Sequence, residues 1–367
     1  MNMKKLKYLF VLLSSVFGYI TLHAQEHQFI LLGDTHYDRL ENHDFNWIAA
    51  EKSGDLRQIE GYAKNSRTNW TAFMKTLKNV ILNSEGQMKA ILQLGDISEG
   101  LAGDNKADQM AAGIVKTIEA ANMPVPWVIT KGNHDVTSGT PAKEAFKAHY
   151  IPLFQRQLKN PNITSANYSY RVGNCEFFVC DYYESSSEML RWLKTAAVAS
   201  TAKYKFMMVH EPVIPVTERC WHMFRKNGDE ANRKELLQIV AENKIIVLAG
   251  HLHRYAVVKR STEWGPIVQL MAGSVISDRN TVTTSKLYTT YSSALATESS
   301  FEPATLASRV AMLDAEAPFV TYYKQCTLQG YGVLKVNETT GAISFDYYGG
   351  LSCTPYDSVN VSELMND

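Results

Sequence analysis

The sequence lacks an excess of charge of either sign, because its 367 residues include 37 basic and 37 acidic side chains. Proteins that bind nucleic acid commonly present a basic face to the phosphate backbone. A balanced chain has no general attraction to nucleic acid or to an anionic membrane surface. We therefore do not expect a nucleic-acid partner, and any anionic substrate must be attracted by a local site.

Cysteine is also scarce. The five cysteines are an odd number in a long chain, which does not fit a framework of disulfides. Cys175 and Cys180 lie in the strand-like segment NCEFFVCDYY, at a spacing that places them on opposite faces of a strand. A bond between these two is not expected, while a pairing of Cys326 with Cys353 stays open. We expect the cysteines to be small buried hydrophobic residues.

Long apolar runs are confined to the N-terminus. Three lysines precede the run YLFVLLSSVFGYITL, and Ala24 offers a small residue for cleavage before Gln25. This order is typical of a secretory signal peptide. The run is shorter than the roughly 18–20 apolar residues that span a bilayer, although an uncleaved anchor is the alternative. The sequence predicts a signal peptide over 1–24, export to the periplasm or the cell exterior, and no stable membrane span after cleavage.

Internal repeats and low-complexity linkers are absent, but one pattern recurs. Strand-like apolar runs end at a polar residue in QFILLGDTH, KAILQLGDIS, VPWVITKGNHD, KFMMVHEP and KIIVLAGHLH. Short runs rich in Ile, Leu and Val indicate buried strands. Helical patterns occur over 67–83, 105–121, 141–158, 187–199 and 230–242. Alternating strands and helices predict an α/β fold.

The pattern becomes β-rich from about residue 253. The segments HRYAVVKR and GPIVQLMAG read as strands, and YGVLKVNETTGAISFDYY reads as a hairpin with its turn at 337–341. The stretch 274–325 is rich in Ser and Thr and only weakly periodic. We expect one domain over 25–367, with 274–325 as a loop or lid insertion.

The trio Asn-His-Asp occurs twice, in GNHD at 132–135 and in ENHD at 41–44. In open α/β sheets, ligands bind beyond the carboxyl ends of the strands. The copy at 132–135 follows an apolar strand and a glycine, and the copy at 41–44 follows neither. We therefore assign Asn133 and His134 to chemistry and interpret Asn42 and His43 as loop residues.

Metal-competent residues follow five strand-like runs in a fixed order. The motifs are Asp-x-His, Gly-Asp-x-x-Glu, Gly-Asn-His-Asp, a single histidine and Gly-His-x-His. Any one of these motifs alone is a weak signal, since a lone histidine after a strand is more often structural. Together they resemble the calcineurin-like metallophosphoesterase superfamily over roughly 29–273. The residues that carry the resemblance are Asp34, His36, Asp96, Asn133, His134, His210, His251 and His253.

The resemblance implies a metallophosphoesterase-type β-sandwich flanked by helices, with a β-rich C-terminal part and a dinuclear metal centre. By the family pattern Asp96 bridges two ions. Imidazole and carboxylate ligands suit Zn, Mn or Fe. Two such ions activate a bridging hydroxide for attack on a phosphate mono- or diester of a small molecule. The pattern assigns Asp34, His36 and His253 to the first ion, and Asn133, His210 and His251 to the second.

Two further residues have catalytic roles in the family pattern. His134 matches the histidine that protonates the leaving oxygen, and Glu99 occupies the position of a carboxylate that orients this histidine. Two positions depart from particular branches of the family. Gly100 replaces the arginine of the phosphoprotein phosphatases, and Glu99 replaces the iron-ligating tyrosine of the purple acid phosphatases.

The loop after His210 is a candidate for substrate binding. It carries Arg219, His222 and Arg225 together with Trp221. Basic groups beside an aromatic ring can bind a phosphate and a planar leaving group. The alternative for this loop is a solvated surface segment.

Other functions stay open at this stage. A protein on the same fold could bind a ligand without catalysis, but every ligand position and His134 are retained. A phosphodiesterase acting on lipid headgroups or nucleotides is a second alternative. A nuclease is disfavoured by the balanced charge. The physiological substrate, the oligomeric state and the identity of the metal do not follow from the sequence.

Overall fold

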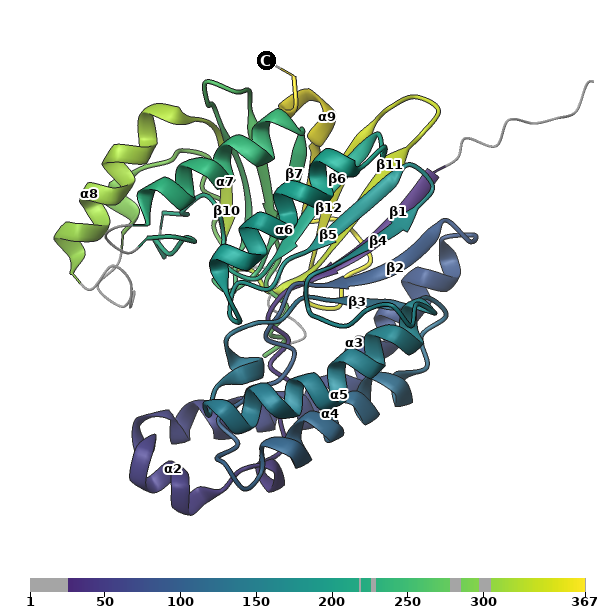
Figure 1. The fold of residues 1–367 in the computed structure, drawn as a ribbon, viewed down its shortest axis with the longest axis vertical. Helices are drawn as coiled ribbons and strands as arrows, with labels where there is room; N and C mark the ends of the chain where they lie inside the picture. Colours follow the sequence, from purple (N-terminus) through teal and green to yellow (C-terminus); the bar gives the residue numbers. More distant parts are fainter. Residues whose placement is uncertain (1–25, 218, 226–228, 278–284, 297–304, 367) are drawn as a thin grey trace, which may run out of the picture.

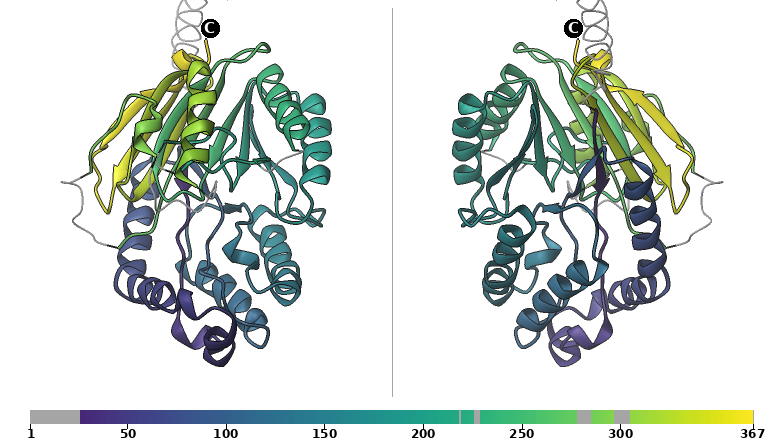
Figure 2. Two further views of the ribbon diagram at one scale, coloured as in Figure 1. Left: turned by 90° about the vertical axis from the view of Figure 1, so that its left-hand side faces the viewer. Right: turned by 90° about the vertical axis from the view of Figure 1, so that its right-hand side faces the viewer.

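Two mixed β-sheets lie face to face, and helices cover their outer faces (Figures 1 and 2). The computed structural model describes residues 26–217, 219–225, 229–277, 285–296 and 305–366. The α/β sandwich with flanking helices and a strand-rich C-terminal part is confirmed. The predicted signal peptide over 1–24 lies outside the described residues.

The first sheet is antiparallel on one side and parallel on the other. Its strand order is β13 (Asp357–Asn360), β12 (Ile343–Gly349), β11 (Gly330–Asn337), β1 (Glu26–Leu32), β2 (Met88–Gln93) and β3 (Trp127–Ile129). β1 runs parallel to β2, and β2 to β3, while β11 pairs with β1 in the antiparallel sense. A strand covered on both faces can be apolar throughout, and Phe29 to Leu32 of β1 are fully buried.

The second sheet has a parallel centre flanked by antiparallel strands. Its order is β10 (Val320–Cys326), β8 (Tyr255–Arg260), β9 (Ile267–Met271), β7 (Ile245–Ala249), β6 (Tyr204–Val209), β5 (Cys175–Val179) and β4 (Tyr168–Val172). The parallel pairs are β5 with β6, β6 with β7, and β7 with β9. The carboxyl ends of β6 and β7 therefore lie at one edge of this sheet.

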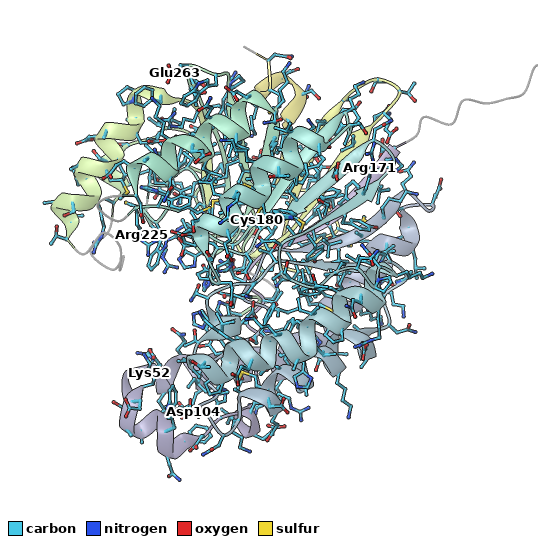
Figure 3. The ribbon with its side chains drawn as sticks, in the orientation of Figure 1. Lys52, Asp104, Arg171, Cys180, Arg225 and Glu263 are labelled. Carbon is cyan, nitrogen blue, oxygen red and sulfur yellow. The ribbon has the colours of Figure 1, made fainter. Side chains whose placement is uncertain are left out.

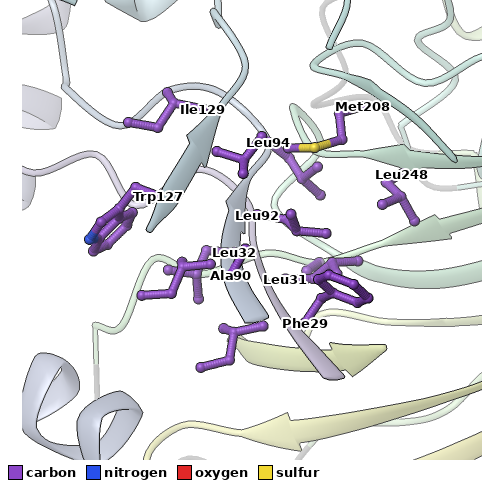
Figure 4. Packing of buried hydrophobic residues seen from close by; sticks show 14 of the residues in the cluster. Phe29, Leu31, Leu32, Ala90, Leu92, Leu94, Trp127, Ile129, Met208 and Leu248 are labelled. Atoms are coloured by element: carbon purple, nitrogen blue, oxygen red, sulfur yellow. The ribbon is translucent and has the colours of Figure 1, made fainter. Parts of the chain in front are cut away.

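Aromatic and aliphatic side chains fill the space between the sheets. Phe29 and Leu31 of β1 point toward Met208 and Leu248 of the second sheet (Figure 4). The ring centroid of Phe29 lies 4.7 Å from that of Phe177 on β5. Burial of such side chains is the main favourable contribution to folding. This core fixes the two sheets against each other and so fixes the relative positions of their edges.

Helices cover the outer faces (Figure 1). The first sheet is covered by α3 (Leu56–Asn83), α4 (Ala107–Ala121) and α5 (Thr140–Leu158), and the second by α6 (Ser186–Ala199) and α7 (Glu230–Glu242). Each predicted helix is present, but α3 begins eleven residues before the predicted start at 67. The short helices α2 (Phe45–Glu51) and α9 (Val361–Leu364) were not predicted.

The segment 274–325 is not the continuous loop that we expected. Its last third contains helix α8 (Leu306–Glu316) and most of strand β10, which pairs with β8 at the edge of the second sheet. That part of the prediction is therefore wrong. Residues 278–284 and 297–304 lie outside the described residues.

The cysteines behave as the strand periodicity predicts. Cys175 belongs to the core between the sheets and Cys180 to the core under α6 and α7, so they lie on opposite faces. All five cysteines are free, including Cys326 and Cys353. Four are buried as expected, but Cys353 is exposed, so the expectation is wrong for that residue. Within the described ranges, we find no helix with both the length and the apolar character to cross a bilayer.

Candidate metal centre

The loops after five strands meet beyond the carboxyl ends of these strands, where the two sheets approach each other. The backbone N–H groups of Asp34 and His36 donate to the carbonyls of Gly95 and Asp96, at 3.1 and 3.0 Å. In the second sheet the Gly250 N–H donates to the carbonyl of His210 at 3.0 Å. These bonds hold neighbouring loops in register and bring together side chains that are far apart in the sequence.

A first cluster of ligand atoms contains Asp34, His36, Asp96 and His253, with one atom from each residue within 4.8 Å of every other. The Nε2 atoms of His36 and His253 are 2.9 Å apart. Asp34 Oδ1 lies 3.6 Å from His253 Nε2, and Asp96 Oδ2 lies 3.8 Å from His36 Nε2. The structure therefore brings together the residues assigned to the first ion.

A second cluster contains Asp96, His210 and His251. Asp96 Oδ2 lies 3.0 Å from His210 Nε2, which is 3.2 Å from His251 Nδ1. The amide oxygen of Asn133 is also 3.2 Å from His210 Nε2. The residues assigned to the second ion are therefore adjacent, and the same oxygen of Asp96 faces both clusters.

Several of these ligand residues have left-handed backbone. Positive φ angles occur at Asp34 (52°), His36 (42°), Asp96 (50°), His251 (70°) and His253 (52°). A non-glycine residue in this region costs on the order of 1–3 kcal/mol, and such residues cluster at functional sites. The Gly-His-x-His motif is a turn here, so its two histidines serve different clusters.

Hydrogen bonds fix the tautomers of two histidines. His36 Nδ1 donates to Glu99 Oε2 at 2.8 Å, and His210 Nδ1 donates to the carbonyl of Leu94 at 2.7 Å. In its neutral form each ring therefore carries the lone pair on Nε2, the atom that faces its cluster. Contacts of this kind are usual behind histidines that bind metals.

The residues present fit a cation. Asp34 Oδ2 and His251 Nε2 are buried, and neither has a hydrogen-bond partner in the described part of the chain. Buried polar atoms rarely lack a partner unless a ligand or ion supplies one. The set of imidazole nitrogens and carboxylate oxygens is the chemistry that transition ions prefer.

The buried carboxylates of the two clusters and the neighbouring imidazoles shift one another's pKa values. Burial raises the pKa of Asp34 to about 7, although His210 opposes this shift. Burial also acts to raise the pKa of Asp96, but the neighbouring imidazoles of His210 and His134 outweigh it and hold that pKa well below its usual value. For His210, burial is outweighed by Asp96, and the pKa rises to about 10. A proton on His210 thus takes the place of a cation.

His134 lies beside the first cluster. Its Nδ1 donates to the backbone carbonyl of Glu99 at 2.6 Å, and its ring meets that of His36 edge to face at 4.7 Å. We expected the Glu99 carboxylate to orient His134, but that carboxylate lies 3.6 Å away and makes its short contact with His36. The orienting group is therefore the main chain of Glu99, and its side chain supports His36.

Sequence reasoning missed the role of Asp135, the last member of the GNHD trio. Its Oδ2 accepts hydrogen bonds from the backbone of Asp96 at 3.0 Å and of Gly132 at 2.8 Å. Its Oδ1 accepts from the backbone and the hydroxyl of Ser98, at 3.1 and 3.0 Å. Asp135 thus joins the loop after β2 to the loop after β3.

The second trio has a structural role. His43 is buried, with Nε2 2.8 Å from Asp38 Oδ1 and Nδ1 donating to the carbonyl of Leu101 at 3.0 Å. Asn42 is buried in a short 3₁₀ helix, and Asp44 caps the N-terminus of α2. His43 lies in the short loop between that 3₁₀ helix and α2, as predicted, and it belongs to none of the ligand clusters found among the described residues. Asn42 differs from the prediction, because it is part of the 3₁₀ helix.

Helix α3 contributes two residues that the sequence did not indicate. Gln58 donates to Glu99 Oε1 at 2.6 Å, and the ring of Tyr62 stacks on His36 with centroids 4.4 Å apart. Both lie in the part of α3 before residue 67, where the apolar periodicity was too weak to predict a helix. A helical prediction there would have placed the two on one face, since they are four residues apart.

The three predicted substrate residues have different environments. Arg219 is half-buried, and its charge acts on Asp34, His251 and His253. His222 is buried with Nδ1 at the carbonyl of Met223, and burial together with the Arg233 charge lowers its pKa to about 3. A neutral, buried His222 does not bind a phosphate, so that prediction is wrong.

Arg225 is already paired within the protein. Its Nη1 donates to Glu211 Oε2 at 3.0 Å, and its guanidinium lies 3.7 Å from the ring centroid of Trp221. That ring is 4.6 Å from the ring of His251. Figure 3 shows Arg225 on the left side of the upper part of the molecule, at about the height of Cys180. Arg225 therefore supports Trp221 and His251 rather than offering a free charge.

The comparisons with known proteins agree with this geometry. A model of the calcineurin-like phosphoesterase family matches residues 27–255. The chain belongs to this family, whose members are metal-dependent phosphoric ester hydrolases. No curated protein matches the chain.

Among solved structures, a purple acid phosphatase, PPD1, from yellow lupin (Lupinus luteus) seeds shares the fold. It has a TM-score of 0.51 and 11% identity, covering 93% of this chain and 55% of that protein. Two weaker matches are also found. TT1561 of Thermus thermophilus has a TM-score of 0.37 and 10% identity, with coverages of 72% and 92%. A Staphylococcus aureus protein provisionally named a 5'-nucleotidase, in complex with alpha-ketoglutarate, has a TM-score of 0.38 and 13% identity, with coverages of 93% and 55%. The chain thus spans about half the length of the lupin and staphylococcal proteins.

Replacement of Gly132 by alanine tests the packing of the two central loops. A Cβ at Gly132 would lie 2.1 Å from Asp96 Oδ1 and 2.2 Å from its backbone nitrogen, so Asp96 must move. We expect Gly132→Ala to lose bound metal, measured by elemental analysis, and to lose about 1–3 kcal/mol of unfolding free energy. Gly61→Ala on α3 is the control, since nothing lies within 4 Å of its Cβ. Full metal content in Gly132→Ala would contradict the assignment.

Proposed function

We propose that the chain is a dinuclear metal-dependent phosphoesterase that hydrolyses a phosphate mono- or diester of a small molecule. The observation that carries the proposal is the position of Asp96. Its Oδ2 faces His210 Nε2 at 3.0 Å in one cluster and His36 Nε2 at 3.8 Å in the other. A carboxylate shared by two sets of ligand atoms is the arrangement that a pair of cations requires.

Divalent transition ions such as Zn, Mn or Fe, when bound there, supply charge neutralisation and a lowered pKa of bound water. One ion would be held by Asp34, His36 and His253. The other ion would be held by Asn133, His210 and His251, and Asp96 would contact both ions. Glu99 holds His36 in the orientation that directs Nε2 to its cluster. Asp135 keeps the loops of Asp96 and Asn133 in place.

His134 is proposed to donate the proton to the leaving oxygen. A carbonyl can only accept, so Nδ1 of His134 must be the donor to Glu99. In the imidazolium form Nε2 therefore carries the second proton and is the atom that can deliver it. The His134 N–H also donates to Asp96 Oδ1 at 2.8 Å, which holds this residue at the centre. A binding protein without catalysis has no need for such a group.

We also propose that the mature chain is exported, on the basis of the basic segment, the short apolar run and the small residue at Ala24. N-terminal sequencing of protein from the cell exterior or the periplasm is expected to begin at or near Gln25. Exported protein that still starts at Met1 would contradict cleavage, and retention in the cytoplasm would contradict export.

The metal content of the purified chain tests the dinuclear proposal. Elemental analysis is expected to find close to two transition ions per chain, and a chelator is expected to abolish hydrolysis of nitrophenyl phosphate and of its bis-ester. Asp96→Asn should reduce occupancy of both sites, because one oxygen of Asp96 faces both clusters. One ion per chain would refute the dinuclear proposal, and full activity in chelator would refute metal dependence.

His134→Ala tests the proposed general acid, and His43→Ala is its control from the other trio. His134→Ala should keep its metals and lose about 100- to 10,000-fold in rate on esters with alkoxide leaving groups. Nitrophenyl esters should suffer less, since nitrophenolate needs little protonation. His43→Ala should instead lose about 1–3 kcal/mol of unfolding free energy, because Asp38 loses a buried partner, with the rate per folded molecule kept. Equal losses across leaving groups in His134→Ala would exclude proton donation.

A further inference from the structure

Two hydrogen-bond donors at the metal centre have no acceptor in the part of the chain that the structure describes. The guanidinium of Arg219 makes no hydrogen bond or ion pair with a described residue, and the Tyr62 hydroxyl makes no hydrogen bond. Both side chains are only partly exposed. Because no described acceptor engages these two groups, both are available to an acceptor that comes from outside the protein.

The two donors approach the same cluster from different elements. Tyr62 comes from helix α3, and its ring is nearly parallel to that of His36 at an interplanar angle of 5°. Arg219 comes from the loop after β6, two residues before Trp221, whose ring packs on His251. The charge of Arg219 acts on both Tyr62 and Asp34. Tyr62 therefore contacts one member of the first cluster, His36, and the charge of Arg219 acts on another member, Asp34.

Arg225, in the same loop, makes the contrast clear. The guanidinium of Arg225 donates a hydrogen bond to Glu211 and lies over the ring of Trp221. Arg219 has no such partners among the described residues. The two arginines are six positions apart and contribute equal charge to the centre. One charge is therefore used within the protein, and the other is left for a ligand.

We propose that Arg219 and Tyr62 form an anion-binding pair that makes the enzyme selective for phosphate monoesters over diesters. This inference rests on the proposed phosphoesterase function and deepens it. A monoester at neutral pH presents three non-bridging oxygens and close to two negative charges. A diester presents two such oxygens and one charge. The guanidinium supplies a forked pair of N–H donors suited to phosphate oxygens, and the additional oxygen of the monoester is the acceptor that both donors lack.

The hydroxyl of Tyr62 adds selectivity of another kind. Its ring is held by the stack on His36, so the direction of the O–H group is set before the substrate arrives. In a diester the corresponding oxygen carries an organic group and accepts a hydrogen bond poorly. Arg219 therefore recognises the additional charge, and Tyr62 recognises the unsubstituted oxygen.

The ratio of kcat/KM for nitrophenyl phosphate to that for its bis-ester tests the pair. The leaving group is the same in both substrates, so proton donation by His134 affects them alike. Loss of a hydrogen bond to a charged group corresponds to about a 10- to 100-fold effect. We expect Arg219→Ala to lower kcat/KM by that factor for the monoester and by less than about threefold for the bis-ester, and Arg219→Lys to restore part of the loss. Tyr62→Phe, which keeps the stack, should lower the ratio by about 3- to 10-fold.

Arg225→Ala is the matched variant, since it removes the same charge from the same loop. Because Arg225 acts through Trp221 and His251, its loss should affect both esters by the same factor and leave the ratio unchanged. Equal losses on both esters in Arg219→Ala, or no loss on either, would overturn the proposal. So would a loss of metal from Arg219→Ala in elemental analysis, since the arginine would then support the metal site.

Binding of inorganic phosphate gives a measurement that does not depend on turnover. Titration calorimetry of the metal-loaded protein is expected to show phosphate affinity reduced about 10- to 100-fold in Arg219→Ala. The reduction in Arg225→Ala should be clearly smaller, and equal weakening in the two variants would contradict the pair. Hydrolysis of neither ester by the metal-loaded wild type would refute the proposed function. Wild-type hydrolysis with an unchanged ester ratio in Arg219→Ala would refute only the anion-binding pair.

Discussion

The carboxylate of Asp96 is the point on which the two halves of the centre depend. One of its oxygens faces an imidazole from each cluster, and the other accepts the backbone N–H of His134. Its own N–H is held by Asp135. Loops from both sheets therefore contact this one residue. The packed core between the sheets is what allows this, because it keeps the two edges in register while the loops themselves carry strained backbone.

This strain is offset by the surrounding structure. Left-handed backbone at five ligand residues costs on the order of 1–3 kcal/mol each in isolation. Beyond the ends of the parallel strands, hydrogen bonds continue between the loops. One of them runs from the Asp34 N–H to the Gly95 carbonyl. Side chains outside the two clusters, Glu99 beside His36 and His134 and Asp135 beside Ser98, complete the network. A sharp turn directly after a buried strand is therefore maintained, and it directs each ligand side chain into its cluster at the end of the strands.

The strands, the helices and the ligand set could be predicted from the sequence because each follows from local order. A buried strand is recognised by its apolar run, and a ligand by its position directly after that run. Three features could not be predicted, since each depends on how the folded chain packs. They are the burial of His222, the contact of Glu99 with His36, and the strand β10 within 274–325. Gln58 and Tyr62 were missed because the apolar periodicity before residue 67 is too weak to predict the first part of α3, and their contacts with Glu99 and His36 join distant segments.

The two Asn-His-Asp trios show how backbone space decides chemistry. At 132–135 the preceding residue is glycine, and the Asp96 carboxylate occupies the position that a Cβ would take. At 41–44 the preceding residue is Glu41, and the histidine turns inward to Asp38 and the Leu101 carbonyl. Both aspartates accept backbone hydrogen bonds, but Asp135 joins two ligand loops whereas Asp44 only caps α2. Identical side chains thus serve catalysis or folding according to how closely a second loop can approach them.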